Sequence, residues 1–395
     1  GISLEELHQT LMGGNLDAKE IARAKDGQAM NFPDGIAECG TDALRFALVA
    51  YTSQARDINL DIKRVVAYRH WCNKLWNAIK FAMINLPEDF TPATTLDVKT
   101  FPMASRWILS RLSCTTKSAV AKLEAYDFGP STQVIYSFWQ NDVCDVFIEL
   151  MKPVMALDEA LAENCERKRA TREALWLCLD TGLRLLHPFM PFVTEELWQR
   201  LPRREDQKST PSIMVAPYPV AEDAWVDQEL ESNMAYIDSV VTRTRQMRSD
   251  YGLTNKQKPT LYIACADAKM SGVLSSAARD IQTLSYSSAV NVVGEGAPLP
   301  KGCSAAVLDA TTSLHIELTG ILDPSKELAR LRKKMGEAEA AKEQLNKKML
   351  MPSYAEKTPE SVKSENVEKL AKKESEIDSI RKCISTMEEM VEGAS

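Results

Sequence analysis

The residue types that most often carry catalysis are scattered in this chain. The four histidines, His8, His70, His187 and His315, lie far apart, and none belongs to a His-Glu-x-x-His or other paired spacing that holds zinc. The nine cysteines include no Cys-x-x-Cys pair and are odd in number, which favours a reducing compartment. Glycine-rich phosphate loops and the Gly-x-Ser-x-Gly turn are also missing from the sequence. The residues alone therefore predict a binding protein without a metal or cofactor of its own.

The first candidate binding surface lies on a helix expected over residues 61–86. Arg69, Asn73, Asn77 and Lys80 are spaced by four, four and three residues, so they share one face of this helix. Such a face could hydrogen-bond to RNA phosphates and bases. The alternative is that the asparagines bond to neighbouring helices while the lysine is solvated.

A second candidate surface follows an apolar stripe over residues 230–241, whose helical continuation reaches Arg245 and Arg248. Arginine presents a planar fork that suits a phosphate or a base edge. Pairing with local carboxylates such as Asp238 or Asp250 is the alternative. The candidate residues of this surface are Arg243, Arg245, Arg248, Lys256 and Lys258.

A third basic group lies near the C-terminus. Apolar residues follow alternating three–four spacing over residues 328–349 and recur every seven residues over 370–391. Pro352 and Pro359 separate the two stretches, which favours an antiparallel coiled-coil hairpin. Its cations stand among nearly as many acids, so a merely solvated exterior is the alternative. The candidate residues are Arg332, Lys333, Lys347 and Lys348.

These surfaces need a mainly α framework to position them. Helical periodicity from Thr41 to about Pro202 predicts a helical bundle, assigned to residues 41–222, with Thr41 as the cap of its first helix. Within the apolar stripe of the helix over 61–86, Trp76 is expected in the core. Residues 223–323 combine a helix with four short β-prone runs, which predicts a small α+β domain. Residues 324–395 form the hairpin, and residues 1–40 are expected to be a linker.

Composition sets broad limits on these expectations. The 395 residues are 45% hydrophobic and 26% charged, which is enough for two to four folded units. The net charge of −7 means that any nucleic-acid surface must be local. No apolar run is long enough for a bilayer span, so no membrane partner is expected.

Four strings of the sequence resemble, in order, the valine–tRNA ligase family of class I aminoacyl-tRNA synthetases. They are FPDGIAECGTDALRFAL over residues 32–48, ARDINLD over 55–61, RHWCNKLWNA over 69–78 and HPFMPFVTEELW over 187–198. The second half of this series is shared with the isoleucine and leucine ligases. The coiled-coil end, which has no paired zinc cysteines, points to the valine enzymes.

The resemblance implies that the complete enzyme uses ATP, valine and magnesium to charge tRNA(Val), and that an editing domain removes mischarged threonine. Both catalytic signatures of the family, His-Ile-Gly-His and Lys-Met-Ser-Lys-Ser, are missing here. We therefore expect this chain to follow the second signature and to be inactive alone. It would comprise the anticodon-binding bundle over residues 41–222, the α+β domain and the arm over 324–395. Its partners would be tRNA(Val) and the catalytic and editing domains of the same enzyme.

The resemblance also favours an RNA role for the face that carries Arg69, and a fastening role for His187 at a helix junction. It implies a cytoplasmic location, or an organelle if a targeting signal precedes Gly1. Two other functions stay open: a free-standing tRNA-binding or regulatory protein derived from the ligase, and a module that tethers protein partners through the coiled coil.

Overall fold

The computed structural model describes residues 1–52, 60–350, 354 and 360–392. Residues 55–59 of the second family-like string, together with Pro352 and Pro359, lie outside the described residues. The chain divides into two compact units, Gly1–Glu231 and Ser232–Ser395, and the division falls within helix α10, Gln228–Asp250. The boundaries of the four predicted parts, 1–40, 41–222, 223–323 and 324–395, remain predictions.

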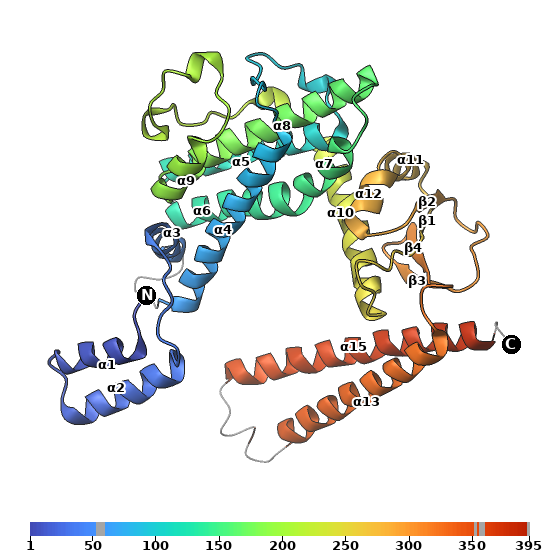
Figure 1. The fold of residues 1–395 in the computed structure, drawn as a ribbon. Helices are drawn as coiled ribbons and strands as arrows, with labels where there is room; N and C mark the ends of the chain where they lie inside the picture. The colour runs from blue at the N-terminus through green and yellow to red at the C-terminus, as the bar shows by residue number, and fades with distance from the viewer. Residues whose placement is uncertain (53–59, 351–353, 355–359, 393–395) are drawn as a thin grey trace. The chain divides into compact units, whose positions relative to one another are not determined.

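The segment over residues 1–40, expected as a linker, contains two helices that pack on each other (Figure 1). They are α1, Leu4–Met12, and α2, Ala18–Asn31. Ser3 and Glu6 form a reciprocal capping box at the start of α1, and Asp17 caps α2. Both caps follow sequence patterns that mark the start of a helix. The prediction of a linker did not take these patterns into account.

The first unit is otherwise a helical bundle, as predicted. Leu75, Ile108, Trp139 and Trp176 are among the large side chains fully buried in its core. Its main elements are α3, Thr41–Tyr51; α4, Ile62–Asn85; α5, Met103–Glu124; α6, Phe128–Ser137; the π-helix η2, Phe138–Phe147; α7, Ile148–Met155; α8, Ala162–Leu186; and α9, Pro191–Trp198. Short 3-10 turns lie at Val98–Thr100, Glu205–Gln207, Ile213–Val215 and Asp223–Trp225.

The π-helix η2 lies between α6 and α7 without a break in the chain. Its Trp139 lies against Gly182 of α8 and donates a 3.2 Å hydrogen bond from Nε1 to the Gly182 carbonyl. A Cβ atom at residue 182 would lie 2.8 Å from the indole ring, so this crossing requires glycine. The wider π turn thus occurs where η2 and α8 approach closely, a contact that the spacing of apolar residues did not predict.

Two details of the bundle differ from prediction: the cap of α3 and the exposure of one tryptophan of α4. Thr41 makes no capping hydrogen bond, because the N-cap position is Gly40. Trp76 was expected in the core but is 41% exposed, whereas Trp71 of the same helix is buried. Val65, Cys72, Leu75 and Ile79 are buried, so α4 buries most of its apolar stripe and exposes the edge that carries Trp76.

The second unit holds a mixed four-stranded sheet in the order β2-β1-β4-β3. Its strands are β1, Leu261–Cys265; β2, Val290–Val293; β3, Cys303–Val307; and β4, Thr312–Glu317. β1 pairs in parallel with β2, and the crossover between them contains the unpredicted helices α11, Ala268–Ser276, and α12, Ala278–Ser285. β4 is antiparallel to both β1 and β3. The small α+β domain is confirmed.

The arm consists of α13, Pro324–Met349, and α15, Glu360–Glu392, which pack along each other (Figure 1). Ion pairs join Arg332 to Glu388 and Lys342 to Glu374, so the two helices are antiparallel. Asp323 caps α13 by accepting from the backbone N–H groups of Ser325 and Lys326. Among the described residues, no helix combines the length and apolar character needed to cross a membrane.

Candidate nucleic-acid interface

The two best-defined family-like strings interlock in the bundle. Asp42 of α3 is buried, and its carboxylate accepts hydrogen bonds from the backbone N–H groups of Phe192 and Val193, at 3.3 and 2.6 Å. These groups belong to the first turn of α9, which has no side-chain cap of its own. Arg45 donates to the Pro188 carbonyl at 3.1 Å. The α3 string thus fixes the start of α9.

His187 fastens the junction between α8 and α9, as predicted. Its Nδ1 lies 2.7 Å from Thr194 Oγ1, and its Nε2 lies 3.0 Å from Met214 Sδ. Burial lowers the pKa of His187, although Glu195 and Asp42 oppose this effect. The imidazole is therefore a neutral structural link between three segments.

This scaffold presents the exposed face of α4. Arg69, Asn73, Asn77 and Lys80 all lie on the surface, and within the described part of the chain their side chains make no hydrogen bond or ion pair. By contrast, Lys74 on the neighbouring face is bound to Asp145 at 2.8 Å. The structure thus brings the predicted row together with its polar groups free.

Exposed apolar side chains accompany this row. Trp76 has the guanidinium of Arg200, from just after α9, 5.1 Å from its ring centroid. Met83 and Ile84 are 41% and 74% exposed farther along α4. Sequence reasoning missed these residues because it assigned the apolar positions of α4 to the core. In nucleic-acid-binding proteins, unpaired bases commonly stack on exposed aromatic side chains near cations.

Arg248 requires a correction. It is only 4% exposed, and it donates hydrogen bonds to the carbonyls of Gln257, Tyr286 and Thr254 at 2.9 to 3.0 Å. Burial lowers the pKa of its guanidinium, but not to a range where it would lose its charge. Arg248 therefore holds loops of the α+β domain and is unavailable to phosphate.

The other members of the second candidate group are more accessible. Arg245 is exposed and uses its Nε in a 2.8 Å hydrogen bond to the Leu284 carbonyl. Lys256 and Lys258 are exposed in the segment after α10, and Arg243 is half-buried on α10. The group is thus dispersed around the end of α10, and the structure does not gather it into one patch.

Three of the four candidates on the arm are paired with acids. Arg332 meets Glu388 at 2.8 Å, Lys333 meets Glu337 at 4.0 Å and Lys347 meets Glu343 at 2.7 Å. The hydrogen bond from Lys347 lowers the pKa of Glu343. Lys348 is exposed, and its charge contributes to the lowered pKa of Glu365. Such exposed pairs contribute little attraction for a distant anion.

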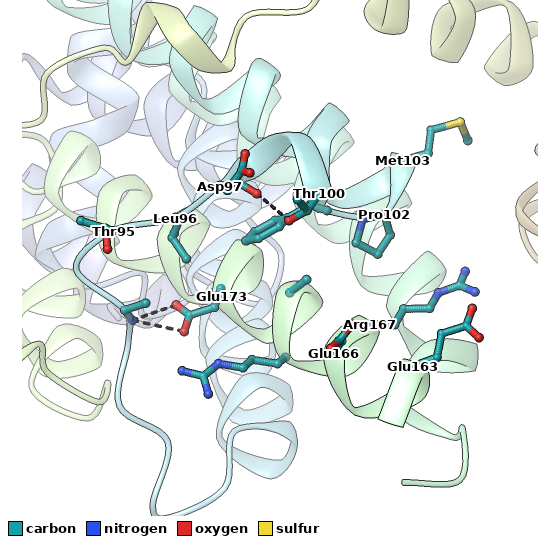
Figure 2. Close-up of a pocket in the computed structure, with 14 residues that line it drawn as sticks. Thr95, Leu96, Asp97, Thr100, Pro102, Met103, Glu163, Glu166, Arg167 and Glu173 are labelled. Carbon is teal, nitrogen blue, oxygen red and sulfur yellow. Dashed lines mark hydrogen bonds between the residues drawn. The ribbon is translucent and has the colours of Figure 1, made fainter. Parts of the chain in front are cut away.

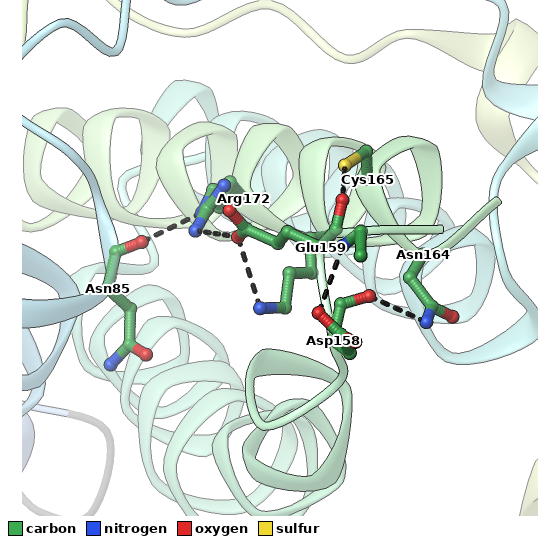
Figure 3. A network of polar contacts seen from close by, with 8 residues as sticks. Asn85, Asp158, Glu159, Asn164, Cys165 and Arg172 are labelled. Atoms are coloured by element: carbon green, nitrogen blue, oxygen red, sulfur yellow. Dashed lines mark hydrogen bonds and ion pairs between the residues drawn. The ribbon is translucent and has the colours of Figure 1, made fainter. Parts of the chain in front are cut away.

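Two further polar sites in the bundle have structural roles. A pocket of about 650 Å³ lies between the segment 93–103 and α8 (Figure 2). Its buried Glu173 accepts from the Ala93 N–H at 3.2 Å, and burial raises the pKa of this carboxyl. In a second site, Glu159 binds Lys168 and Arg172, each at 3.1 Å (Figure 3). Both carboxylates tie loops to α8. Among the described residues, no group of histidine, cysteine and acidic side chains could hold a metal ion.

Comparison with known proteins identifies two parts of the chain. Residues 105–263 match the family model described as "Anticodon-binding domain of tRNA ligase", and residues 323–388 match "Valyl tRNA synthetase tRNA binding arm". Among solved structures, the LeuRS chain of a LeuRS–tRNA–LeuAMS complex from Agrobacterium radiobacter K84 is 18% identical in sequence. The match covers 48% of this chain and 20% of that chain, with a TM-score of 0.35.

Relatives match nearly the whole chain. The "Valine--tRNA ligase, mitochondrial 1" of Arabidopsis thaliana is 44% identical over 97% of this chain and 34% of its own length. The "Valine--tRNA ligase" of Homo sapiens is 42% identical over 99% of this chain and 30% of its own length. The "Valine--tRNA ligase, mitochondrial" of Saccharomyces cerevisiae is 34% identical over 99% of this chain and 35% of its own length. Over nearly its whole length, this chain is thus similar to a part of the valine–tRNA ligases, and it spans about a third of the length of these relatives.

Proposed function

We propose that the chain binds tRNA(Val) and supplies tRNA recognition to a valine–tRNA ligase, the enzyme that attaches valine to its tRNA using ATP. The observation that carries this proposal is the exposed face of α4. There Arg69, Asn73, Asn77 and Lys80 make no hydrogen bond or ion pair with any residue that the structure describes, and they lie beside the exposed Trp76. The matches to an anticodon-binding domain and a tRNA-binding arm support it.

The chemistry of this face suits a single-stranded loop of RNA. The two cations would meet phosphates, and the amides of Asn73 and Asn77 can both donate to and accept from base edges. Trp76 offers an aromatic surface for an unstacked base, a contact worth about 1–3 kcal/mol. Bases of an anticodon loop can be splayed outward in this way, whereas the bases of a duplex cannot.

The catalytic steps are assigned to other parts of a complete ligase. ATP, valine and magnesium would bind there, and no residue of this chain is assigned to them. We expect no valine-dependent exchange of pyrophosphate with ATP by the purified chain, and such exchange would overturn the assignment. We place the protein in the cytoplasm or, as with its mitochondrial relatives, in an organelle. The tRNA and the remaining domains of the ligase would be its partners, and the arm would act as a coiled-coil tRNA support.

Filter binding of tRNA(Val) at several salt concentrations tests the proposal, with a tRNA of another anticodon as the specificity control. The double variant Arg69→Ala with Lys80→Ala should weaken binding roughly tenfold, or about 1.4 kcal/mol. The matched control neutralises two other lysines of the same helix, Lys63→Ala with Lys74→Ala. Equal effects of the two variants would show that the chain attracts RNA only by general charge.

A further inference from the structure

The second unit contains a groove where α10 meets both helices of the arm. Its volume is about 950 Å³, within the range of about 300–1,000 Å³ typical of ligand sites. Four cations from three helices line it, together with the polar Gln246 and Ser249 of α10. These cations are Arg243 of α10, Lys334 of α13, and Lys372 and Lys382 of α15.

The groove cations differ from most cations of the arm in lacking partners. Within the described residues, none of the four makes an ion pair with an acid. Elsewhere on the arm, by contrast, Lys342 binds Glu374 at 2.9 Å and Lys369 binds Glu365 at 2.7 Å. The arm therefore neutralises many of its outer cations and leaves these four free, facing one concavity.

Buried contacts at the root of the arm hold the groove in shape. Arg330 of α13 binds the buried Glu327, with Nε 2.9 Å from its Oε2, and donates to the Asp250 carbonyl of α10 at 3.2 Å. Tyr251, which follows α10, is buried and donates from its hydroxyl to Ser304 of β3 at 2.9 Å. Met387 of α15 is fully buried. The three walls of the groove thus share one packed root.

Two carboxylates also line the groove, and both have partners. Asp250 accepts a 3.0 Å hydrogen bond from Gln246, and Asp378 is paired with Arg381 at 2.9 Å. Four cations against two partnered acids leave the groove positive, although the chain as a whole carries a net charge of −7. The groove is thus the kind of local basic site that an acidic protein needs to bind a polyanion.

The spread of charge indicates the kind of anion. Lys372 and Lys382 are ten residues apart on one helix, which separates them by about 15 Å at 1.5 Å per residue. A single phosphate group could not meet both cations, whereas a chain of phosphates could. The amide of Gln246 and the hydroxyl of Ser249 can hydrogen-bond to phosphate or ribose oxygens.

We propose that this groove binds a stretch of the RNA phosphodiester backbone, and that it, more than the outer face of the arm, supplies the electrostatic part of RNA binding by the second unit. This inference rests on the proposed function and adds a site that sequence reasoning did not find. Of its cations, Arg243 was among the sequence-based candidates, and the convergence of α10, α13 and α15 brings the other three into the same groove.

The test compares two triple variants of the full 395-residue chain. The groove variant is Lys334→Gln, Lys372→Gln and Lys382→Gln. The control variant is Lys333→Gln, Lys347→Gln and Lys369→Gln, which removes the same charge from cations already paired with acids. Filter binding with a tRNA(Val) transcript from low to moderate salt gives the affinity and its log–log salt slope, and circular dichroism checks folding.

We expect the groove variant to lose about two to three units of salt slope and roughly tenfold to a hundredfold in affinity, while the control loses less than about one unit. Ser249→Glu, which adds a negative charge and removes no cation, should weaken binding about fivefold or more, and this second variant keeps the test decisive if the triple variant folds poorly. Equal slopes in the two triple variants would overturn the groove while leaving tRNA binding intact. Failure of the unsubstituted chain to bind tRNA would overturn the proposed function as well. Displacement of the RNA by polyglutamate at matched charge would assign the groove to an acidic protein segment instead.

Discussion

Helices α4 and α10 carry similar series of basic and polar residues, yet their arginines have opposite surroundings. On α4, Arg69 lies at the surface with no hydrogen bond or ion pair in the described part of the chain. On α10, Arg248 is buried and bonded to three carbonyls. The difference follows from position, because Arg248 lies on the face that α10 buries, next to Met247, whereas Arg69 lies on an exposed face of α4. An arginine on the buried face of a helix is therefore a candidate for structure before it is a candidate for binding.

The largest effect expected from this comparison is on stability. Arg248→Ala removes three hydrogen bonds from a charged group and leaves buried carbonyls unsatisfied, so the second unit should lose about 3 kcal/mol. Urea denaturation measures the loss. Arg248→Lys, which keeps the charge without the planar fork, should fall between the wild type and the alanine variant. A loss below about 1 kcal/mol for the alanine variant would place Arg248 back among the candidates for RNA contact.

The next effect concerns the two tryptophans of α4. Trp76→Ala should weaken tRNA binding by about 1–3 kcal/mol, because the exposed indole would lose a stacked base. The matched variant is Trp71→Phe, which changes a buried indole whose Nε1 has no hydrogen-bond partner among the residues that the structure describes. It should leave the affinity unchanged. If Trp76→Ala binds tRNA as tightly as the wild type, the exposed face of α4 does not stack bases.

A smaller effect should appear in the pH dependence of the bundle. Burial lowers the pKa of His187 below its usual 6.5, so the folded state favours the neutral ring. Stability from this residue is present above pH 6.5 and is lost as the pH falls through the lowered folded pKa. Arg248, by contrast, keeps its charge throughout this range.

The melting temperature of the bundle should therefore fall between pH 7.5 and pH 5.5, and the fall should be smaller in His187→Gln. His70→Gln, at an exposed position of α4, is the control and should behave as the wild type. An unaltered fall in His187→Gln would mean that other groups carry the pH dependence.

The smallest effect belongs to Arg245, which stands between the two cases. Its hydrogen bond to the Leu284 carbonyl should contribute about 0.5–1.5 kcal/mol to stability. Because Arg245 is exposed, Arg245→Ala should also reduce the salt slope of tRNA binding by up to about one unit. A stability loss as large as that of Arg248→Ala would remove the distinction between the two arginines.

The sequence by itself determined where most helices and strands lie, because the residues that start, stop and pattern them are close together in the chain. Helix α4 was expected over residues 61–86 and spans Ile62–Asn85, since Asp61 caps its start and Pro87 follows its end. All four strands lie where β-prone runs predicted them. The row from Arg69 to Lys80 was also predicted, because residues three and four apart share a helix face wherever the helix packs.

Tertiary structure alone decided which faces are buried and which cations remain free. The carbonyls that bind Arg248 at Gln257 and Tyr286 lie 9 and 38 residues away in the sequence, and spacing along α10 contains no trace of them. Asp42 of α3 caps the start of α9, about 150 residues away. The groove cations likewise come from three helices that meet only in the folded chain. A periodic pattern fixes the angle between residues on one helix, but the rotation of that helix against its neighbours depends on side chains that are distant in the sequence.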